Sequence, residues 1–112
     1  MGFFNFGNNK AEIQSCALKI STGLGQIEQE YASSNGQATP VVKGIASALQ
    51  NEVRTLERLL KPNGKTDWNL YNSMTVKWHN GNEIPFRLFE ARLNNEARVL
   101  KAQTGIDIAI WL

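Results

Sequence analysis

Apolar residues recur along residues 9–32 at the spacing of one face of a helix. They follow one another at intervals of three and four residues: Ile13, Ala17, Ile20, Leu24, Ile27 and Tyr31. Asn9, followed three residues later by Glu12, resembles a capping box with Asn9 as the N-cap. Gly23 and Gly25 each weaken a helix by about 1 kcal/mol relative to alanine. We therefore expect a bend or a break at these glycines, or a second backbone packed closely against them.

The same periodicity returns over residues 39–61, after the polar segment 33–38. The apolar positions are Val42, Ala46, Leu49, Val53, Leu56 and Leu60. Thr39 is suited to the N-cap and Pro40 to the first helical position, where its missing N–H costs nothing. Two such helices with a short connection predict an antiparallel helical hairpin over residues 9–61. We expect its interface to bury Val53 and Leu56 against Ile20, Leu24 and Ile27.

Residues 66–88 lose the helical period. Residues 66–71 predict either a helical turn capped by Thr66 or an ordered loop. Residues 74–88 predict a β-hairpin, with a three-residue loop in which Asn82 is left-handed, since this register gives one apolar face. The expected cross-strand pairs are Trp78 with Ile84, Val76 with Phe86, and Met74 with Leu88. Pro85 cannot donate a ladder hydrogen bond, so we expect an edge strand or an exposed position there.

The last part of the chain predicts a helix followed by a strand. The helix, residues 88–103, has an apolar face and a C-terminal cap at Gly105. Residues 106–112 alternate as a strand does, which would turn Asp107, Ala109 and Trp111 away from the core. The sequence thus predicts an α+β fold of order ααββαβ, a single domain over residues 1–112. Its helical hairpin (9–61) packs with a ββαβ portion (66–112).

Composition is consistent with one globular domain of 112 residues, with 42% hydrophobic and 20% charged residues and a net charge of +2. Cys16 is the single cysteine, which excludes an intrachain disulfide and favours a reducing, cytoplasmic location. No apolar run reaches the roughly 18 residues of a membrane span, and the start of the chain lacks the pattern of a secretory signal. We expect the cluster Phe3, Phe4 and Phe6 to pack on the helical hairpin.

Candidate catalytic residues are sparse. His79 and Cys16 have no local partner that would make a nucleophile pair, and we expect Cys16 to be a buried thiol. Zinc needs three or four ligands, and no glycine-rich phosphate loop follows a strand. Asp107 is unusual inside an apolar strand, but a solvent-facing position on a one-sided sheet explains it. The sequence therefore predicts no enzyme, no metal and no cofactor.

Aromatic and basic residues are the remaining candidates for function. Tryptophan and tyrosine are enriched in binding hot spots, so the candidate protein-binding residues are Trp68, Tyr71, Trp78 and Trp111, although core filling explains most such residues. For Trp111 a core position is favoured over an interface position. Basic side chains along the second helix can contact phosphates, and these are Arg54, Arg58, Lys61 and Lys65. A second basic group comprises Arg87, Arg92, Arg98 and Lys101.

Our first hypothesis from the sequence is a small non-enzymatic binding protein, of adaptor or inhibitor type. It would act through a protein interface or by self-association, and a homo-oligomer is expected because the predicted sheet has an exposed edge. The alternatives are a nucleic-acid-binding protein that uses the basic stripe of the second helix, and an enzyme of unknown type.

Overall fold

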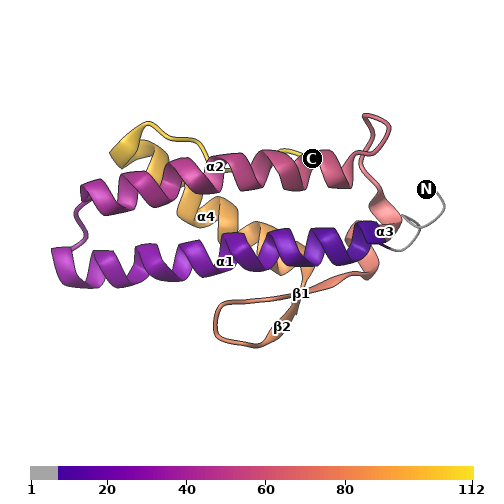
Figure 1. Cartoon of the computed structure of the whole chain (residues 1–112), viewed down its shortest axis with the longest axis horizontal. Coiled ribbons are helices and arrows are strands. Elements are labelled where there is room, and N and C mark those ends of the chain that lie inside the picture. Colours follow the sequence, from indigo (N-terminus) through magenta and orange to yellow (C-terminus); the bar gives the residue numbers. More distant parts are fainter. Residues whose placement is uncertain (1–7) are drawn as a thin grey trace.

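The computed structural model describes residues 8–112. It contains helices α1 (Asn8–Ser34), α2 (Pro40–Leu60), α3 (Trp68–Ser73) and α4 (Phe86–Thr104), and strands β1 (Thr75–Lys77) and β2 (Glu83–Pro85). In Figure 1, α1 and α2 lie side by side, α4 lies behind them, and the two strands lie along the side of α1 opposite α2. The α+β fold with an N-terminal helical hairpin is confirmed. The predicted packing of Phe3, Phe4 and Phe6 lies outside the described residues.

The apolar faces of α1 and α2 form the interface of the helical hairpin. All six predicted α2 positions are buried, as are Ile13, Ala17, Ile20, Leu24 and Ile27 of α1. Thr39 caps α2 as expected, with its Oγ1 accepting from the N–H of Val42 at 3.2 Å. Asn9, in contrast, lies within α1 rather than at its cap, and its side-chain amide donates to the carbonyl of Leu59 at 3.0 Å.

Helix α1 is continuous through both glycines, so the expected bend or break is wrong. A Cβ at Gly23 would lie 2.6 Å from the side chain of Leu49, and one at Gly25 would lie 3.0 Å from the ring of His79. The alternative expectation, that another part of the chain packs closely against the glycines, is therefore correct. The neighbours, however, are side chains rather than a second backbone. The two glycines admit α2 on one side and the β-hairpin loop on another.

The β-hairpin has a different register from the predicted one. Val76 pairs with Ile84, and the N–H of Trp78 donates to the carbonyl of Asn82 at 2.8 Å. The loop is His79-Asn80-Gly81, with Gly81 at φ 88°. This shift by two residues keeps the same side chains on the apolar face, but it places glycine instead of asparagine at the left-handed position, where it costs least.

The register also moves the start of α4. Because β2 ends at Pro85, α4 begins at Phe86, earlier than the predicted residue 88. Pro85 is exposed, as expected. Gly105 ends α4 in the left-handed conformation at φ 77°, which confirms the predicted cap. The short helix α3 also confirms the helical-turn alternative, although its cap is Asp67 rather than Thr66.

Residues 106–112 do not form the predicted strand, and the sheet within the described residues has two strands. The segment instead lies against α2 and α4, whose side chains satisfy its backbone. Gln50 donates to the carbonyl of Asp107 at 3.1 Å, and the amide of Asn94 both donates to and accepts from the backbone of Ile110. Strand propensity was insufficient here because no strand lies alongside to complete the pairing.

Asp107 has a different role from the predicted solvent-facing strand position. Its carboxylate accepts the N–H of Ala109 at 2.9 Å, and this hydrogen bond lowers the pKa of Asp107 below its usual range. The resulting turn breaks the period of two. Ala109 is therefore buried together with Ile108 and Ile110.

None of the helices within residues 8–112 combines the length and the apolar composition that crossing a bilayer requires.

Replacement of Leu56 by alanine tests the interface between α1 and α2. Leu56 is fully buried, so Leu56→Ala should lower the free energy of unfolding by about 2–5 kcal/mol in urea titrations. Val41→Ala is the matched control, because Val41 is an exposed aliphatic residue of the same helix, and its effect should stay within about 0.5 kcal/mol. Similar losses for both variants would contradict the described packing.

Candidate functional site

The four aromatic residues predicted to bind a protein divide into a buried and an exposed pair. Tyr71 and Trp78 are buried, whereas Trp68 is 53% and Trp111 60% exposed. Trp78 packs edge-on against Phe89, and the guanidinium of Arg92 lies 5.1 Å above its ring. Trp78 is therefore a core residue. The favoured core position of Trp111 is wrong, because the turn at Asp107 buries Ala109 and leaves the indole outside.

Trp68 contacts Tyr71, which lines an apolar groove between α3 and α4. Its ring packs edge-on against Tyr71, with centroids 5.2 Å apart. The groove, which we call the α3–α4 groove, has a volume of about 540 Å³ and is lined by Tyr71, Asn72, Pro85, Arg87, Leu88 and Ala91. The hydroxyl of Tyr71 donates to Glu90 at 2.5 Å, which orients the tyrosine wall. Arg87 is the charged side chain of this lining.

Trp111 has different surroundings, and its backbone is held by α2. Glu57 accepts the N–H of Trp111 at 2.8 Å, and Lys61 donates to its carbonyl at 2.9 Å. Arg54 donates to the carbonyl of Ala109 at 2.9 Å. The indole thus projects from a backbone that is bonded to two side chains of α2 and to Lys61, the residue that caps its C-terminus.

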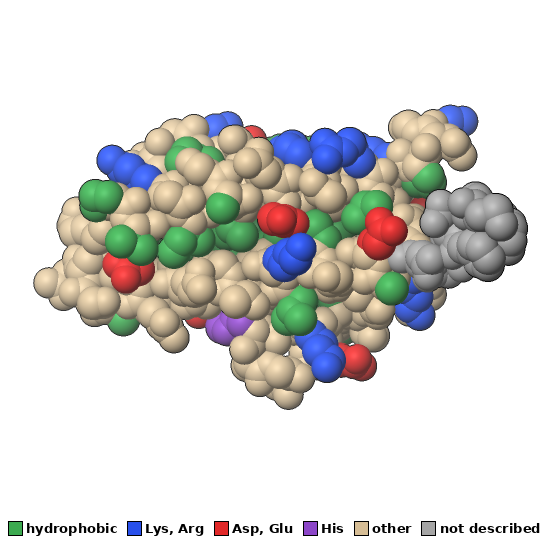
Figure 2. Space-filling model, viewed as in Figure 1, with side chains coloured by type: hydrophobic (Ala, Val, Ile, Leu, Met, Phe, Trp, Pro, Cys, Tyr) green, Lys and Arg blue, Asp and Glu red, His purple; other side chains and the backbone are tan. Residues whose placement is uncertain are grey.

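Two clefts meet at Trp111. One has a volume of about 830 Å³ and is lined by Arg54, Glu57, Arg58, Lys61, Pro62, Gly64 and Trp111. The other, of about 350 Å³, is lined by Asn94, Ala97, Arg98, Lys101, Asp107, Ala109 and Trp111. We call Trp111 and the basic residues of both clefts, Arg54, Arg58, Lys61, Arg98 and Lys101, the Trp111 surface. Basic side chains also gather along the α2 edge of the molecule in Figure 2.

The basic stripe predicted on α2 is only partly available. Arg54 pairs with Glu57, and Lys65 does not line the cleft that the other three share. Two basic residues of α4, Arg98 and Lys101, line the second cleft at Trp111 and add to this basic surface. The sequence predicted both basic groups. No short-range pattern could show that the C-terminal segment places Trp111 between them.

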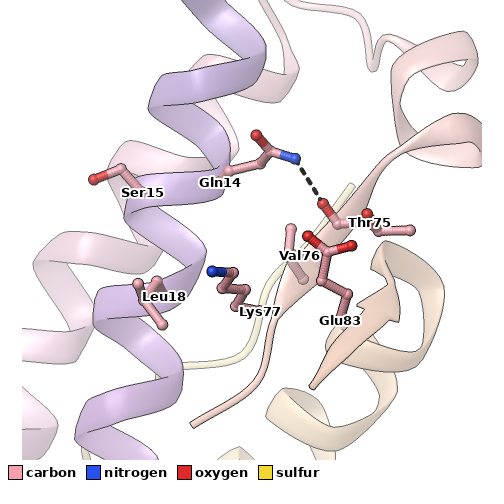
Figure 3. A pocket seen from close by; sticks show the side chains of 7 residues that line it. All are labelled: Gln14, Ser15, Leu18, Thr75, Val76, Lys77 and Glu83. Atoms are coloured by element: carbon pink, nitrogen blue, oxygen red, sulfur yellow. Dashed lines mark hydrogen bonds between the residues drawn. The ribbon is translucent and has the colours of Figure 1, made fainter. Parts of the chain in front are cut away.

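A third groove lies between α1 and β1 (Figure 3). Gln14 donates to the carbonyl of Thr75 at 2.9 Å, and the buried hydroxyl of Ser21 accepts the N–H of His79 at 2.6 Å. The remaining space, about 260 Å³, has Leu18, Lys77 and Glu83 among its lining residues. The expected self-association rested on the exposed edge of a sheet that included residues 106–112 as its last strand, and this strand is not formed.

Two carboxyl groups from different helices meet beside the hairpin loop, a feature that the sequence analysis missed. Burial raises the pKa of Glu96 on α4 to about 7, together with the hydrogen bond and the negative charge of Glu28 on α1. The Nε2 atom of His79 lies 3.5 Å from the carboxylate of Glu28. Burial and the charge of Glu96 also raise the pKa of Tyr31. Because Glu28 and Glu96 belong to different helices, the residue spacing within one helix could not reveal this pair.

Cys16 is buried, as expected, and its thiol donates to the backbone carbonyl and the carboxylate of Glu52 at 3.2 and 3.3 Å. Burial and the neighbouring Glu52 carboxylate raise its pKa to about 12, so the nucleophilic thiolate is suppressed. Within residues 8–112, no cluster of three or more His, Cys, Asp and Glu side chains is arranged to hold a metal ion.

No protein-family model matches this chain, and neither a curated protein nor a solved structure shows significant similarity to it.

Alanine variants of the buried Trp78 and the exposed Trp111 test how these two side chains are packed. Trp111→Ala should change the free energy of unfolding by no more than about 0.5 kcal/mol, as exposed substitutions do. Trp78→Ala should cost about 3–5 kcal/mol, because it empties a buried site. Chemical denaturation followed by far-UV circular dichroism measures both. A loss at Trp111 comparable to the loss at Trp78 would mean that the indole is packed.

The carboxyl pair predicts a specific pH dependence of stability. The folded-state pKa of Glu96, about 7, lies above its ordinary value of 4.5. Its protonated form therefore contributes stability that is fully present below pH 4.5 and is lost as the pH rises through about 7. Glu96→Gln stays neutral, so its stability relative to the wild type should increase over this interval and then level off. Urea titrations at several pH values measure the difference, and parallel curves would contradict the pairing.

Proposed function

We propose that this chain is a non-enzymatic binding protein, of adaptor or inhibitor type, that holds a protein segment in the α3–α4 groove. The observation that carries the proposal is an apolar groove whose wall residue Tyr71 is in edge-on contact with Trp68, a tryptophan that is 53% exposed. Tryptophan is among the residues most enriched in binding hot spots. An exposed ring that contacts the wall of an apolar groove is typical of a protein interaction site.

The lining of the groove defines the chemistry of the segment. Pro85, Leu88 and Ala91 offer apolar contacts, and about 540 Å³ accommodates a few apolar side chains. Arg87 is the charged lining residue, and its exposed guanidinium lies near Asn72 and the hydroxyl of Tyr71. Its remaining N–H donors can pair with a carboxylate. The fitting occupant is a segment with aliphatic or aromatic residues next to an aspartate or glutamate.

A binding role is favoured over an enzymatic one by the state of Cys16. It is the single thiol of the chain, and its raised pKa keeps it in the unreactive protonated form. Glu96, the carboxyl group whose pKa is raised, lines none of the clefts described above.

Selection of peptides from a random library tests the proposal and requires no identified partner. The library, displayed on phage, should yield sequences with apolar residues adjacent to Asp or Glu. Trp68→Ala should abolish their enrichment, and Arg87→Glu should change the selected charge from acidic to basic. Val99→Ala, at an exposed apolar position of α4 outside the groove lining, is the matched control and should select the same peptides as the wild type.

Each other outcome has a definite meaning. Peptides that survive both Trp68→Ala and Arg87→Glu bind elsewhere, which would refute the groove as the site. A wild-type dimer in sedimentation that Trp68→Ala converts to a monomer would replace the partner by a second copy of this chain. This would be the self-association expected from the sequence, through a different surface.

A further inference from the structure

A second exposed tryptophan has surroundings that do not fit the same kind of partner. The linings of the two clefts at Trp111 contain five basic side chains, Arg54, Arg58, Lys61, Arg98 and Lys101. Apolar contacts in these linings come mainly from Pro62, Ala97 and Ala109. The basic side chains distinguish these clefts from the α3–α4 groove, whose lining has one charged residue, and they offer several cations to an anion.

The carboxylates of the Trp111 surface are already engaged. Glu57 accepts the N–H of Trp111 and pairs with Arg54. Asp107 accepts the N–H of Ala109. These internal bonds balance part of the charge of the larger cleft but leave the charges of Arg58, Arg98 and Lys101 without an acidic partner among the described ion pairs. The surface is therefore basic on both sides of the indole.

Trp111 combines exposure with a defined position. Trp111 is 60% exposed, but its backbone N–H is bonded to Glu57 of α2 and its carbonyl to Lys61, the C-cap of α2. Because the backbone is fixed, stacking of another flat group on the ring has to order the side chain alone, which lowers the entropy cost. Since the ring lines both clefts, a chain that crosses it passes from one group of basic side chains to the other.

We infer that the Trp111 surface binds single-stranded nucleic acid, with a base stacked on Trp111 and phosphates held by Arg58 and Lys61 on one side and by Arg98 and Lys101 on the other. Stacking requires an unpaired base, which a duplex does not offer, and the basic groups on both sides follow a phosphate backbone. An acidic polypeptide supplies the charge but has no regular series of flat rings. This inference is independent of the α3–α4 groove, which lies on other residues.

Fluorescence anisotropy with a fluorescein-labelled oligothymidylate tests the inference. Trp111→Ala should weaken binding by roughly 5- to 100-fold, the usual effect of removing one stacking residue, while the salt dependence stays the same. Arg58→Ala and Arg98→Ala should each weaken binding and lower the slope of log affinity against log salt by about 0.7. Lys43→Ala, a basic residue on an exposed position of α2 outside both clefts, is the matched control.

Three results would overturn the inference. The first is no saturable binding of the oligonucleotide by the wild-type protein. The second is equal affinity for a duplex of the same length with no effect of Trp111→Ala, which would indicate charge attraction alone. The third is equally effective competition by polyglutamate, which would assign the surface to an acidic protein. Trp68→Ala should leave oligonucleotide binding unchanged, so this experiment fails or succeeds separately from the peptide selection.

Discussion

The apolar contact between α1 and α2 is the interaction on which the other parts of the fold depend. Ile20, Leu24, Val53 and Leu56 are completely buried in it, and the two glycines of α1 permit the close approach of Leu49 and of the hairpin loop. Once this contact forms, each helix presents polar positions next to its apolar face. Those of α1 hold β1, through Gln14 and Ser21. Those of α2 hold the C-terminal segment, so the helical hairpin carries an attachment on each of its two helices.

The C-terminal segment illustrates how backbone hydrogen bonds can be satisfied without a sheet. A buried extended segment needs a partner for each peptide group, and in a sheet a neighbouring strand provides it. Here Gln50, Arg54 and Glu57 of α2 and Asn94 of α4 provide donors and acceptors instead. These side chains therefore hold the C-terminal segment in place. This arrangement also determines where Trp111 projects, and thereby creates the basic surface around it.

The two exposed tryptophans differ in their surroundings, so residue type alone does not define what a surface offers to a partner. Trp68 packs against Tyr71, a wall of an apolar groove, and burial of apolar surface favours association in general. Trp111 stands between basic side chains, an arrangement of charge that attracts anions. The two surfaces share no lining residue, and under the proposed adaptor role they would serve partners of different chemistry.

Local sequence patterns determined the helices, the caps at Thr39 and Gly105, and the apolar face of the hairpin, because these depend on residues a few positions apart. They also identified Trp68 and the basic residues as candidates. Only the tertiary structure decided the rest. A register shift by two residues keeps the same apolar face, so alternation could not choose between the two pairings, and the left-handed Gly81 did. Residues 106–112 have the composition of a strand, but a strand requires a neighbour, and the neighbours are helices. The meeting of Glu28 with Glu96, and of two basic groups at Trp111, joins residues far apart in the chain, whose proximity depends on how the helices pack.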